Sequence, residues 1–472
     1  MSRAAEPQIG FADWEFKQQQ IFLEPLLQGI ATFLDEHHAM IEPVRRDLER
    51  GLTHAATGRR GMTPPQVLRS LILMRVKNWH YRELRERIAD GYTLRCFTDF
   101  LSQPVPKHDA FNRAFNRLTP ETLQAINALV VQAAVDLGLE EGQMLRVDTT
   151  VVQTDIHHPT DNTLLWDTVR VITRGVRRLA QALGRRVQGF RNRTRAARRR
   201  MLRIQRMTAK ERHHQQTKTY RELIAITTEV VDGARQVLQR TRKARGTDPI
   251  AEVALGEVRK EIDHYCQLGT RVIDQARRRV LDGEQVPTAD KIYSIFEPHT
   301  DVIKRGKFLT PVEFGHKVFL AESEQGLITQ YEVLNGNPSD EDQVEPSLER
   351  HRDTFGGAPD LYGSDRGFYS ESNLKACRDE GVKTVCIPQR GGKKTAKRKA
   401  YEKSAAFKRG QRFRAGIEGR ISVLFRGRGM KRCLAEGRER FELLVGAAVL
   451  TNNLMRIAAL LMKRTPRRRR AA

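Results

Sequence analysis

The chain has 472 residues and a formal net charge of +26, because 83 lysines and arginines outnumber 57 acidic residues. This length suits two or three domains with a large core. So large an excess of positive charge favours a polyanionic partner, most simply nucleic acid, over a basic protein that is merely soluble. An anionic membrane surface is a further option, but no lipidation motif is visible.

The sequence carries little sign of a secreted, membrane-spanning or disulfide-bonded protein. No secretory signal is recognisable at the N-terminus. Two asparagines and an arginine interrupt the most apolar late stretch, Phe441 to Met462. It therefore lacks the roughly 20 uninterrupted apolar residues of a membrane span and predicts a buried helix. Five scattered cysteines form no CxxC pair, which argues against a disulfide framework or a thiolate zinc site and fits a reducing cytoplasm.

Residues 1–143 are expected to form a helical N-terminal domain. Thr63, followed by two prolines, predicts a helix start. Short helices are predicted at 81–89, 93–101, 108–117 and 120–137. Arg113 and Arg117 lie four residues apart, so they are expected to share a helix face. Short helices with an arginine-bearing member favour a helix-turn-helix-like DNA-binding domain, and a plain helical bundle is the alternative.

A basic helical insertion is predicted at residues 166–286. Between Arg174 and Arg212 the sequence has fifteen lysines and arginines against one acid, Glu211. Farther on, apolar residues recur at heptad-like spacing on two long helices joined by a loop at 246–249. We expect two or three antiparallel, coiled-coil-like helices, of which the first is basic enough to lie along phosphates. The heptads by themselves indicate packing only.

A buried strand with an acidic residue is predicted at Met144 to Val152, where apolar and β-branched residues surround Asp148. A buried aspartate is costly unless it is paired or binds a metal. A structural aspartate or a strand-end cap is the alternative. Further strands are predicted at 291–296, 317–321 and 328–334, so the Asp148 strand is expected to join a meander.

A second acidic strand end is predicted at Asp365. A helix near 343–353 precedes this strand, and a helix at 373–380 and a strand at 384–387 follow it. Residues 390–414 have the composition of a basic loop, in which Glu402 is the only acid. The next segment predicts a helix with one apolar face that carries Glu418. Residues 465–472 are expected to form a basic tail.

Two strand aspartates and one helical glutamate, in a very basic protein, suit a two-metal phosphoryl-transfer site. The three residues are Asp148, Asp365 and Glu418. Mg²⁺ prefers a few carboxylate oxygens and retains waters, and two such ions about 4 Å apart activate the attacking oxygen and stabilise the leaving one. Clustered carboxylates without metal repel each other and hold a proton. We therefore expect dependence on two Mg²⁺ ions, with Mn²⁺ as a substitute, and little activity at acid pH.

Other candidate ligands near the first strand are weaker. Asp155 is odd-spaced from Asp148 and would face the other side of a continuing strand. Asp161 follows a proline in a predicted loop. The adjacent His157 and His158 have no Cys or Glu at zinc-ligand spacing, so they are expected to be loop residues.

A basic turn that contains Lys304 and Arg305 lies between His299 and His316. Its positive charges suit phosphate oxygens. The turn is therefore expected to contact DNA, with a solvated hairpin as the alternative.

Several local sequences resemble the DDE transposases of bacterial insertion sequences, and most of all the ISNCY-type group. In the N-terminal part the resemblance lies in YRELRERIADGYTLRCFTDF. Farther along it lies in VDTTVVQTDIHHPTDNTLLWDTVRVITR, FEPHTDVIKRGK, PVEFGHKV, YGSDRGFYS and RAGIEGRISVLFRGRGMKR. These segments occur in the family's order and span about residues 60 to 460.

The resemblance implies an α/β RNase H-like catalytic core, a mixed sheet with flanking helices, at 144–165 and 287–464. The family's acids fall on Asp148, Asp365 and Glu418, as catalytic residues and metal ligands. The N-terminal domain would bind terminal inverted repeats, and the enzyme would cut at transposon ends and join the exposed 3′-hydroxyls to target DNA. The resemblance also implies a homodimer or higher oligomer on paired ends, in the bacterial cytoplasm and at the nucleoid when bound to DNA.

The sequence departs from the Tyr–Arg–Glu–Lys signature of related insertion-sequence families. Arg414 stands four residues before Glu418, but Gln411 occupies the tyrosine position. No lysine stands seven residues after Glu418, although Arg426 stands eight after it. Both arginines are expected to contact phosphates, and no tyrosine-dependent strand separation is carried over. A metal nuclease without strand transfer and a catalytically inactive DNA-binding descendant are the two rival functions.

Overall fold

The computed structural model describes residues 10–18, 22–52, 61–304 and 312–464. The chain divides into two compact units, one formed by residues 1–154 and 303–472 and the other by residues 155–302. Each unit has a hydrophobic core of its own.

The N-terminal part of the first unit is helical. Its α-helices are α1 (Phe11–Gln18), α2 (Pro25–Glu36), α3 (Ile41–Glu49), α4 (Pro64–Lys77), α5 (Tyr81–Asp90), α6 (Tyr92–Phe97), α7 (His108–Phe115) and α8 (Pro120–Asp136). The predicted helix start at Thr63 is confirmed as a capping box. Thr63 Oγ1 accepts from the Gln66 backbone N–H at 3.2 Å, and Gln66 Oε1 accepts from the Thr63 N–H at 3.0 Å.

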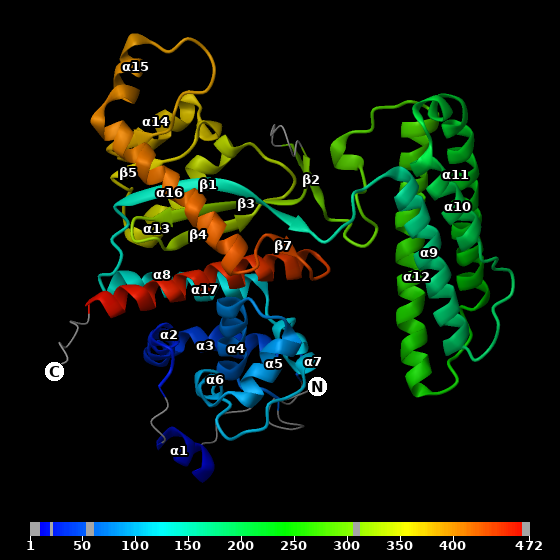
Figure 1. Ribbon diagram of the computed structural model, residues 1–472, viewed down its shortest axis with the longest axis horizontal. Coiled ribbons are helices and arrows are strands. Elements are labelled where there is room, and N and C mark those ends of the chain that lie inside the picture. The colour runs from blue at the N-terminus through cyan, green and yellow to red at the C-terminus, as the bar shows by residue number, and fades with distance from the viewer. Residues whose placement is uncertain (1–9, 19–21, 53–60, 305–311, 465–472) are drawn as a thin grey trace. The chain divides into compact units, whose positions relative to one another are not determined.

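A long C-terminal helix, α17 (Arg438–Arg464), packs against α2, α4 and α8 (Figure 1). Its residues Leu450, Leu454 and Ile457 are buried in one core with residues of these N-terminal helices. By length and composition α17 could cross a membrane, but 67% of its most apolar stretch is buried inside the protein, so the predicted buried helix is confirmed. Because the N-terminal helices share this core, they do not form a separate compact unit, and the domain boundary at 143 stays a prediction.

The first unit contains a mixed β-sheet with the strand order β2-β3-β1-β5-β6, in which β4 also pairs with β3 and β7 with β1 (Figure 1). The strands are β1 (Met144–Thr154), β2 (Asp301–Lys304), β3 (Val312–Ser323), β4 (Ile328–Val333), β5 (Leu361–Gly363), β6 (Thr384–Cys386) and β7 (Arg432–Cys433). β1 runs antiparallel to β3, with Asp148 opposite Leu320. It runs parallel to β5, with Arg146 opposite Gly363. The Asp148 strand is thus central in the sheet.

Helices cover both faces of this sheet. α13 (Val344–Phe355) and α14 (Glu371–Asp379) pack on the face where Phe319 is buried. α16 (Ala405–Gly427) and α17 pack on the face where Leu320 is buried. The neighbours Phe319 and Leu320 fall into different cores because side chains alternate along a strand, and both faces are apolar because both are covered. A mixed sheet with flanking helices agrees with the predicted α/β class.

The predicted strand at 291–296 is wrong. Ile292 and Ile295 are buried in the helical core of the second unit. The Gln275 side chain accepts from the Ile292 N–H at 2.7 Å and donates to the Ile292 carbonyl oxygen at 3.3 Å. The β-rich composition here therefore reflects burial against helices, and the glutamine satisfies the backbone groups that a neighbouring strand would otherwise pair with.

The predicted basic loop at 390–414 is also wrong. α15 (Ala396–Lys403) and α16 begin at the N-caps Thr395 and Ser404, whose side chains accept from backbone N–H groups in the first turn. Glu402 forms ion pairs with two basic neighbours. Capping and this local neutralisation stabilise helices in a segment whose positive charge suggested a loop.

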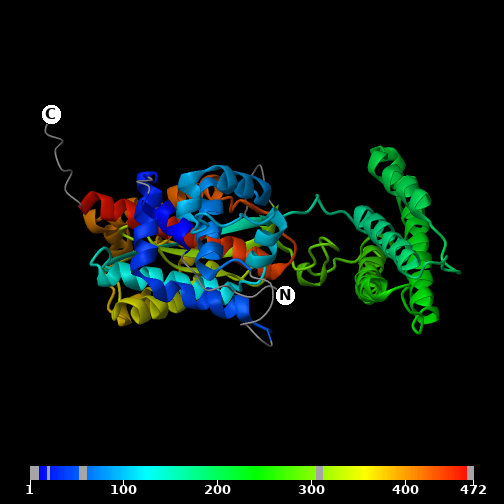
Figure 2. The same cartoon turned by 90° about the horizontal axis from the view of Figure 1, so that it is seen from below.

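Residues 155–302 form a helical unit (Figure 1, Figure 2). Its α-helices are α9 (Asp161–Ala182), α10 (Thr194–Arg206), α11 (Ala209–Arg240) and α12 (Pro249–Ala276). α9, α11 and α12 pack against one another, and α10 packs on α9 and α11. Close packing depends on small residues, since a Cβ on Gly175 would lie 2.7 Å from Cγ1 of Ile262. The segment predicted as a helical insertion is helical, with four α-helices where two or three were expected.

Candidate active site

Asp148 lies in the middle of β1, and its side chain is only 13% exposed. Its Oδ1 accepts from the Thr149 backbone N–H at 2.8 Å. Burial raises the pKa of Asp148 to about 6; the positive charge of Arg414 opposes this shift, and the carboxylates of Asp365 and Asp340 add to it. The strand thus holds a carboxylate whose ionised form depends on a nearby cation.

Asp365 follows the end of β5, the strand next to β1. Because Arg146 pairs with Gly363 in the parallel register, Asp148 and Asp365 each stand two residues beyond a paired position. Asp365 Oδ1 accepts from the Gly367 backbone N–H at 2.7 Å and caps the short 3₁₀ turn that follows. The sheet register therefore brings the two predicted aspartates to the same level of adjacent strands.

Glu418 lies on α16, which packs against β1, β5 and β6. Its side chain is 67% exposed. On the same helix, Gln411 donates from Nε2 to the carbonyl oxygens of Ser364 at 3.3 Å and Cys386 at 2.6 Å, just at the ends of β5 and β6. The glutamine at the signature's tyrosine position thus fastens α16 to the strand ends.

The guanidinium of Arg414 lies between the three predicted acids. Its Nη2 is 3.1 Å from Asp148 Oδ2 and 4.0 Å from Asp365 Oδ2, and its Nη1 is 3.0 Å from Glu418 Oε1. In both aspartates the other oxygen, Oδ1, accepts a backbone N–H. Hydrogen bonds from backbone N–H groups therefore orient each aspartate so that its second oxygen points toward the guanidinium of Arg414.

This donor set suits a hard divalent ion, since carboxylate oxygens are the ligands that Mg²⁺ prefers. Within the described parts of the chain, however, no three acidic, imidazole or thiol side chains stand close enough to hold an ion as they are. The Arg414 guanidinium occupies the space between the acids. Ion binding by these acids therefore requires that Arg414 move away from at least one of them.

A fourth carboxylate, that of Asp340, lies beside the site and was not among the predicted site residues. Asp340 Oδ1 accepts from Thr149 Oγ1 at 2.8 Å and from Lys317 Nζ at 3.0 Å. A Cβ on Gly367 would lie 2.9 Å from an oxygen of Asp340 and 2.9 Å from one of Asp365, so the two carboxylates converge over this glycine. A short acidic run within a strongly basic chain is the one signal that marks Asp340 in the sequence.

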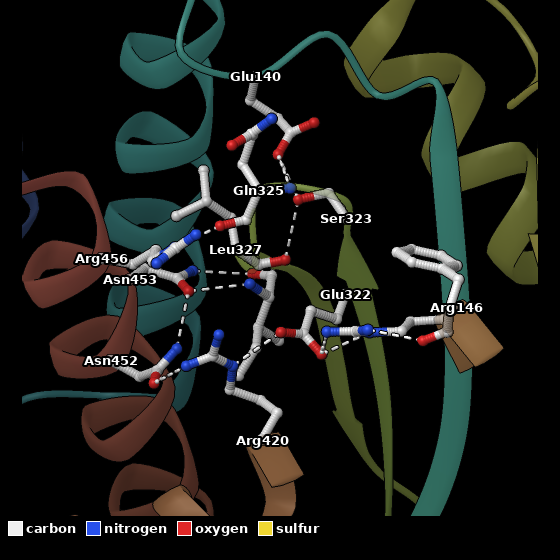
Figure 3. Close-up of polar contacts among 12 residues, drawn as sticks. Glu140, Arg146, Glu322, Ser323, Gln325, Leu327, Arg420, Asn452, Asn453 and Arg456 are labelled. Atoms are coloured by element: carbon white, nitrogen blue, oxygen red, sulfur yellow. Dashed lines mark hydrogen bonds and ion pairs between the residues drawn. The ribbon is translucent and has the colours of Figure 1, made fainter. Parts of the chain in front are cut away.

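A buried ion-pair network ties β1 to α16 next to the acids (Figure 3). Glu322 of β3 is fully buried. Its Oε2 accepts from Nε of Arg146 at 2.8 Å and lies 2.8 Å from Nη2 of the same guanidinium. Its Oε1 accepts from Nε of Arg420 at 2.7 Å. Arg146 stands two residues before Asp148, and Arg420 stands two after Glu418. One carboxylate thus holds together the strand and the helix that carry two of the three acids.

Arg146 reaches the backbone of α16 because the helix has a glycine there. Its Nη1 donates to the Phe413 carbonyl oxygen at 2.6 Å, and its guanidinium carbon lies 4.7 Å from the centre of the Phe413 ring. A Cβ on Gly416 would lie 2.1 Å from the same Nη1. Gly416 therefore permits the contact that connects the strand to the helix.

The network continues into α17 (Figure 3). Arg420 Nη1 donates to Asn452 Oδ1 at 3.2 Å. Asn453 donates from Nδ2 to the Ile328 carbonyl oxygen at 2.8 Å, and its Oδ1 accepts from the Ile328 N–H at 2.9 Å. The asparagines that interrupt the apolar sequence of α17 are thus buried and satisfied by the sheet and α16.

The predicted DNA contacts Arg113 and Arg117 do not share a helix face. α7 ends at Phe115, so only Arg113 lies on it, where it is exposed and pairs with Asp109 at 2.6 Å. Arg117 donates to the carbonyl oxygen of Arg50, whose guanidinium donates back to the Arg117 carbonyl oxygen at 2.8 Å. The prediction of a shared helix face is wrong, because α7 ends two residues before the predicted end at 117 and the reciprocal hydrogen bonds with Arg50 hold Arg117 in the following turn.

The remaining predicted DNA contacts lie apart from the acids or outside the described residues. Lys304 is exposed at the end of β2. Arg305 falls outside the described residues. Arg426 is exposed on α16, eight residues and about 12 Å along the helix from Glu418. Neither Lys304 nor Arg426 forms an ion pair with the three acids, and their role in DNA binding stays a prediction.

The weaker ligand candidates after β1 have other surroundings. Asp161, at the start of α9, pairs with Arg279 at 2.7 Å. His157 is bonded to Asp167 at 2.7 Å. Asp155 is exposed just beyond the end of β1. Asp161 and His157 therefore have structural partners within the second unit.

Two family models match the chain. The model described as Transposase domain (DUF772) matches residues 18–117, and the model described as Transposase DDE domain matches residues 274–454. The second match contains Asp365 and Glu418 and begins after Asp148. Most of the second unit lies between the two matches. No protein with a curated description and no solved structure is detectably similar to the chain.

Proposed function

The two matches indicate an insertion-sequence transposase of the DDE class, and on that premise we propose that the protein binds terminal inverted repeats and catalyses Mg²⁺-dependent strand cleavage and strand transfer. Transposases of this class are polynucleotidyl transferases that generally use divalent metal ions. The net charge of +26 suits a DNA substrate. The proposal includes an RNase H-like core and an oligomer that holds paired transposon ends.

The observation that carries the proposal is the convergence of three acids on Arg414. The acids come from β1, from the end of β5 and from α16, more than 200 residues apart in sequence at the extremes. Asp365 and Glu418 are 39% and 67% exposed. Exposed ion pairs contribute little to stability, so the solvent-facing carboxylates of Asp365 and Glu418 are better explained by ligand binding than by a structural role.

Asp148, Asp365 and Glu418 are the residues that would hold divalent ions. A bound ion polarises the phosphoryl group and lowers the pKa of the attacking oxygen. The acids keep their orientation because backbone N–H groups hold one oxygen of each aspartate. Arg414 exchanges its carboxylate partners for phosphate oxygens, which its planar guanidinium binds in a bidentate manner.

The test uses the full-length protein, a labelled duplex from the boundary of the insertion sequence that contains this reading frame, and a supercoiled target plasmid. We expect Mg²⁺-dependent cleavage at the repeat end and joining to the plasmid. Asp148→Asn should lower both rates by about a hundredfold or more, since lost metal ligation costs several kcal/mol of transition-state stabilisation. Binding of the uncut end should persist. Asp155→Asn, a matched change just beyond β1, should leave both rates unchanged.

Each rival function has its own outcome in this experiment. Cleavage of the transposon end without joining to the plasmid would identify the protein as a metal nuclease without strand transfer. End binding without cleavage by the parent protein, in Mg²⁺ and in Mn²⁺, would assign a catalytically inactive descendant. An Asp148→Asn variant that cleaves like the parent would show that the site is misassigned.

A further inference from the structure

One face of α10 is rich in exposed arginines. The helix has six arginines and no acid in 13 residues. Ala197, Met201 and Ile204 are buried in the core of the second unit. The exposed residues of the opposite side, termed the α10 arginine face, are Arg195, Arg198, Arg199 and Arg206. At 3.6 residues per turn these four fall within an arc of about 100°, so their charges point in one general direction.

The two other arginines of α10 have partners inside the unit. Arg200 pairs with Glu222 at 3.1 Å, and Arg203 donates to Gln215 Oε1 at 2.6 Å. Within the described residues, no ion pair involves the α10 arginine face. Like charges three or four residues apart destabilise a helix by a few tenths of a kcal/mol per pair. The face therefore gains nothing from the unit itself and is suited to an external anion.

We propose that the α10 arginine face binds the phosphate backbone of duplex DNA, independently of sequence. The guanidinium fork matches phosphate oxygens, and no acid occurs between Arg174 and Lys210 to oppose an approaching polyanion. A membrane surface fits less well, because interfacial helices insert an apolar face. The apolar face of α10 is already buried in the core.

This surface is separate from everything that the family matches assign. Most of the second unit, α10 included, lies between residues 117 and 274, where neither transposase model matches. It has its own core and contains none of the three candidate acids. The inference rests on the proposed function only in that DNA is the substrate.

The size of the expected effect follows from the number of arginines. α10 is about 20 Å long, and duplex DNA carries one charge per ~1.7 Å of its axis, so four contacts are within its reach. Each neutralised phosphate contributes about 0.9 to the slope of log binding constant against log salt concentration. Four contacts contribute about 3.6, which corresponds to a roughly 150-fold change in affinity between 50 and 200 mM salt.

The test is the salt dependence of DNA binding by the full-length protein, measured by fluorescence anisotropy with a duplex of unrelated sequence and with a transposon-end duplex. In one variant all four residues of the α10 arginine face become Gln, which has a helix propensity close to that of Arg. The slope should fall by about 3.6 for both duplexes. The control variant removes the same charge from exposed positions of the same unit, through Arg242→Gln, Lys243→Gln, Lys260→Gln and Arg271→Gln. Its slope should change by less than about 1.

The outcomes decide the proposal. An unchanged slope in a variant with parental helix content would overturn it, and so would an equal fall in the control, which would indicate a general effect of net charge. If the fourfold variant does not fold, two half-variants (Arg195→Gln with Arg199→Gln, and Arg198→Gln with Arg206→Gln) should each lower the slope by about 1.8. The proposal would also be overturned if the fourfold variant lost binding to anionic vesicles or to RNA while its slope for DNA stayed unchanged. Asp148→Asn should keep the parental slope, so failure of the catalytic proposal is distinguishable from failure of this one.

Discussion

Removing the carboxylate of Glu322 tests whether one buried group holds the candidate active site together. Glu322 is fully buried, accepts hydrogen bonds from Nε of Arg146 at 2.8 Å and from Nε of Arg420 at 2.7 Å, and pairs with Nη2 of Arg146 at 2.8 Å. The two arginine side chains are only 13% and 20% exposed. In Glu322→Ala both guanidinium groups lose their shared counter-ion and stay buried.

The expected loss is large because the charges cannot reach water easily. Breaking a buried ion pair by removing one partner costs about 3–5 kcal/mol. We expect Glu322→Ala to lower the free energy of unfolding of the first unit by about 4 kcal/mol. Glu322→Gln should lower the free energy of unfolding less, because the amide carbonyl oxygen still accepts one hydrogen bond from an arginine. A hydrogen bond to a charged group contributes about 1.5–3 kcal/mol.

Hydrogen exchange read by mass spectrometry over a urea series measures this loss for each unit. Peptides from β1 and α16 should lose protection, whereas peptides from α11 and α12 should not change, because the second unit has its own core. Glu380→Ala is the matched control, since Glu380 forms an exposed pair with Arg352 at 2.8 Å and should cost less than about 1 kcal/mol. If Glu322→Ala costs no more than Glu380→Ala, the reasoning about the buried network is refuted.

Three further predictions concern the same site. Because folding raises the pKa of Asp148 from 3.8 to about 6, the metal-free protein should lose up to about 3 kcal/mol of stability as the pH rises from 4 to 7. Denaturant titrations in the presence of a chelator should show that the Asp148→Asn variant lacks this loss. Parallel pH profiles of stability for the variant and the parent protein would contradict the prediction. Gly416→Ala should destabilise the first unit by about 1–3 kcal/mol in thermal unfolding, because the added Cβ would lie 2.1 Å from Arg146 Nη1. Gly419→Ala on the same helix places its Cβ in open space and should stabilise the unit by up to about 1 kcal/mol. Equal effects of the two substitutions would argue against the close contact at Gly416. Arg414→Ala should tighten Mn²⁺ binding, measured by calorimetry, about tenfold, because the charge-assisted bond between Arg414 and Asp148 no longer competes with the ion. Weaker binding by the variant would show that Arg414 does not occupy the ion site.

The elements that carry the three acids could be predicted because their signals are local. The β-branched run around Asp148 forms a strand, the Leu-Tyr-Gly sequence before Asp365 forms a short strand, and the apolar spacing around Glu418 forms a helix. The approach of the acids to one another was inferred from the family resemblance. The described geometry supports it, and their catalytic role stays a prediction.

Other features could not be predicted because they depend on contacts between distant residues. Glu322 and Asp340 become significant through partners about 100–190 residues away. Ile292 lies in an apolar, β-rich segment, but its backbone pairs with Gln275 in place of a strand. The helices of 390–414 depend on two N-caps and one ion-paired glutamate, and the many positive charges around them conceal these short signals.

The pairing of β1 with β3 also has a consequence for the order of events during synthesis. Asp148 pairs across the sheet with Leu320, about 170 residues later in the chain. At an elongation rate of about 5–20 residues per second, β1 waits roughly 10–35 s for its neighbour. The second unit is made during this interval, and a helical unit with a local core can fold while the strand is still unpaired. Its folding shortens the flexible loop that remains to be closed before β1 pairs with β3, at the stage when an unpaired strand edge is most prone to aggregation.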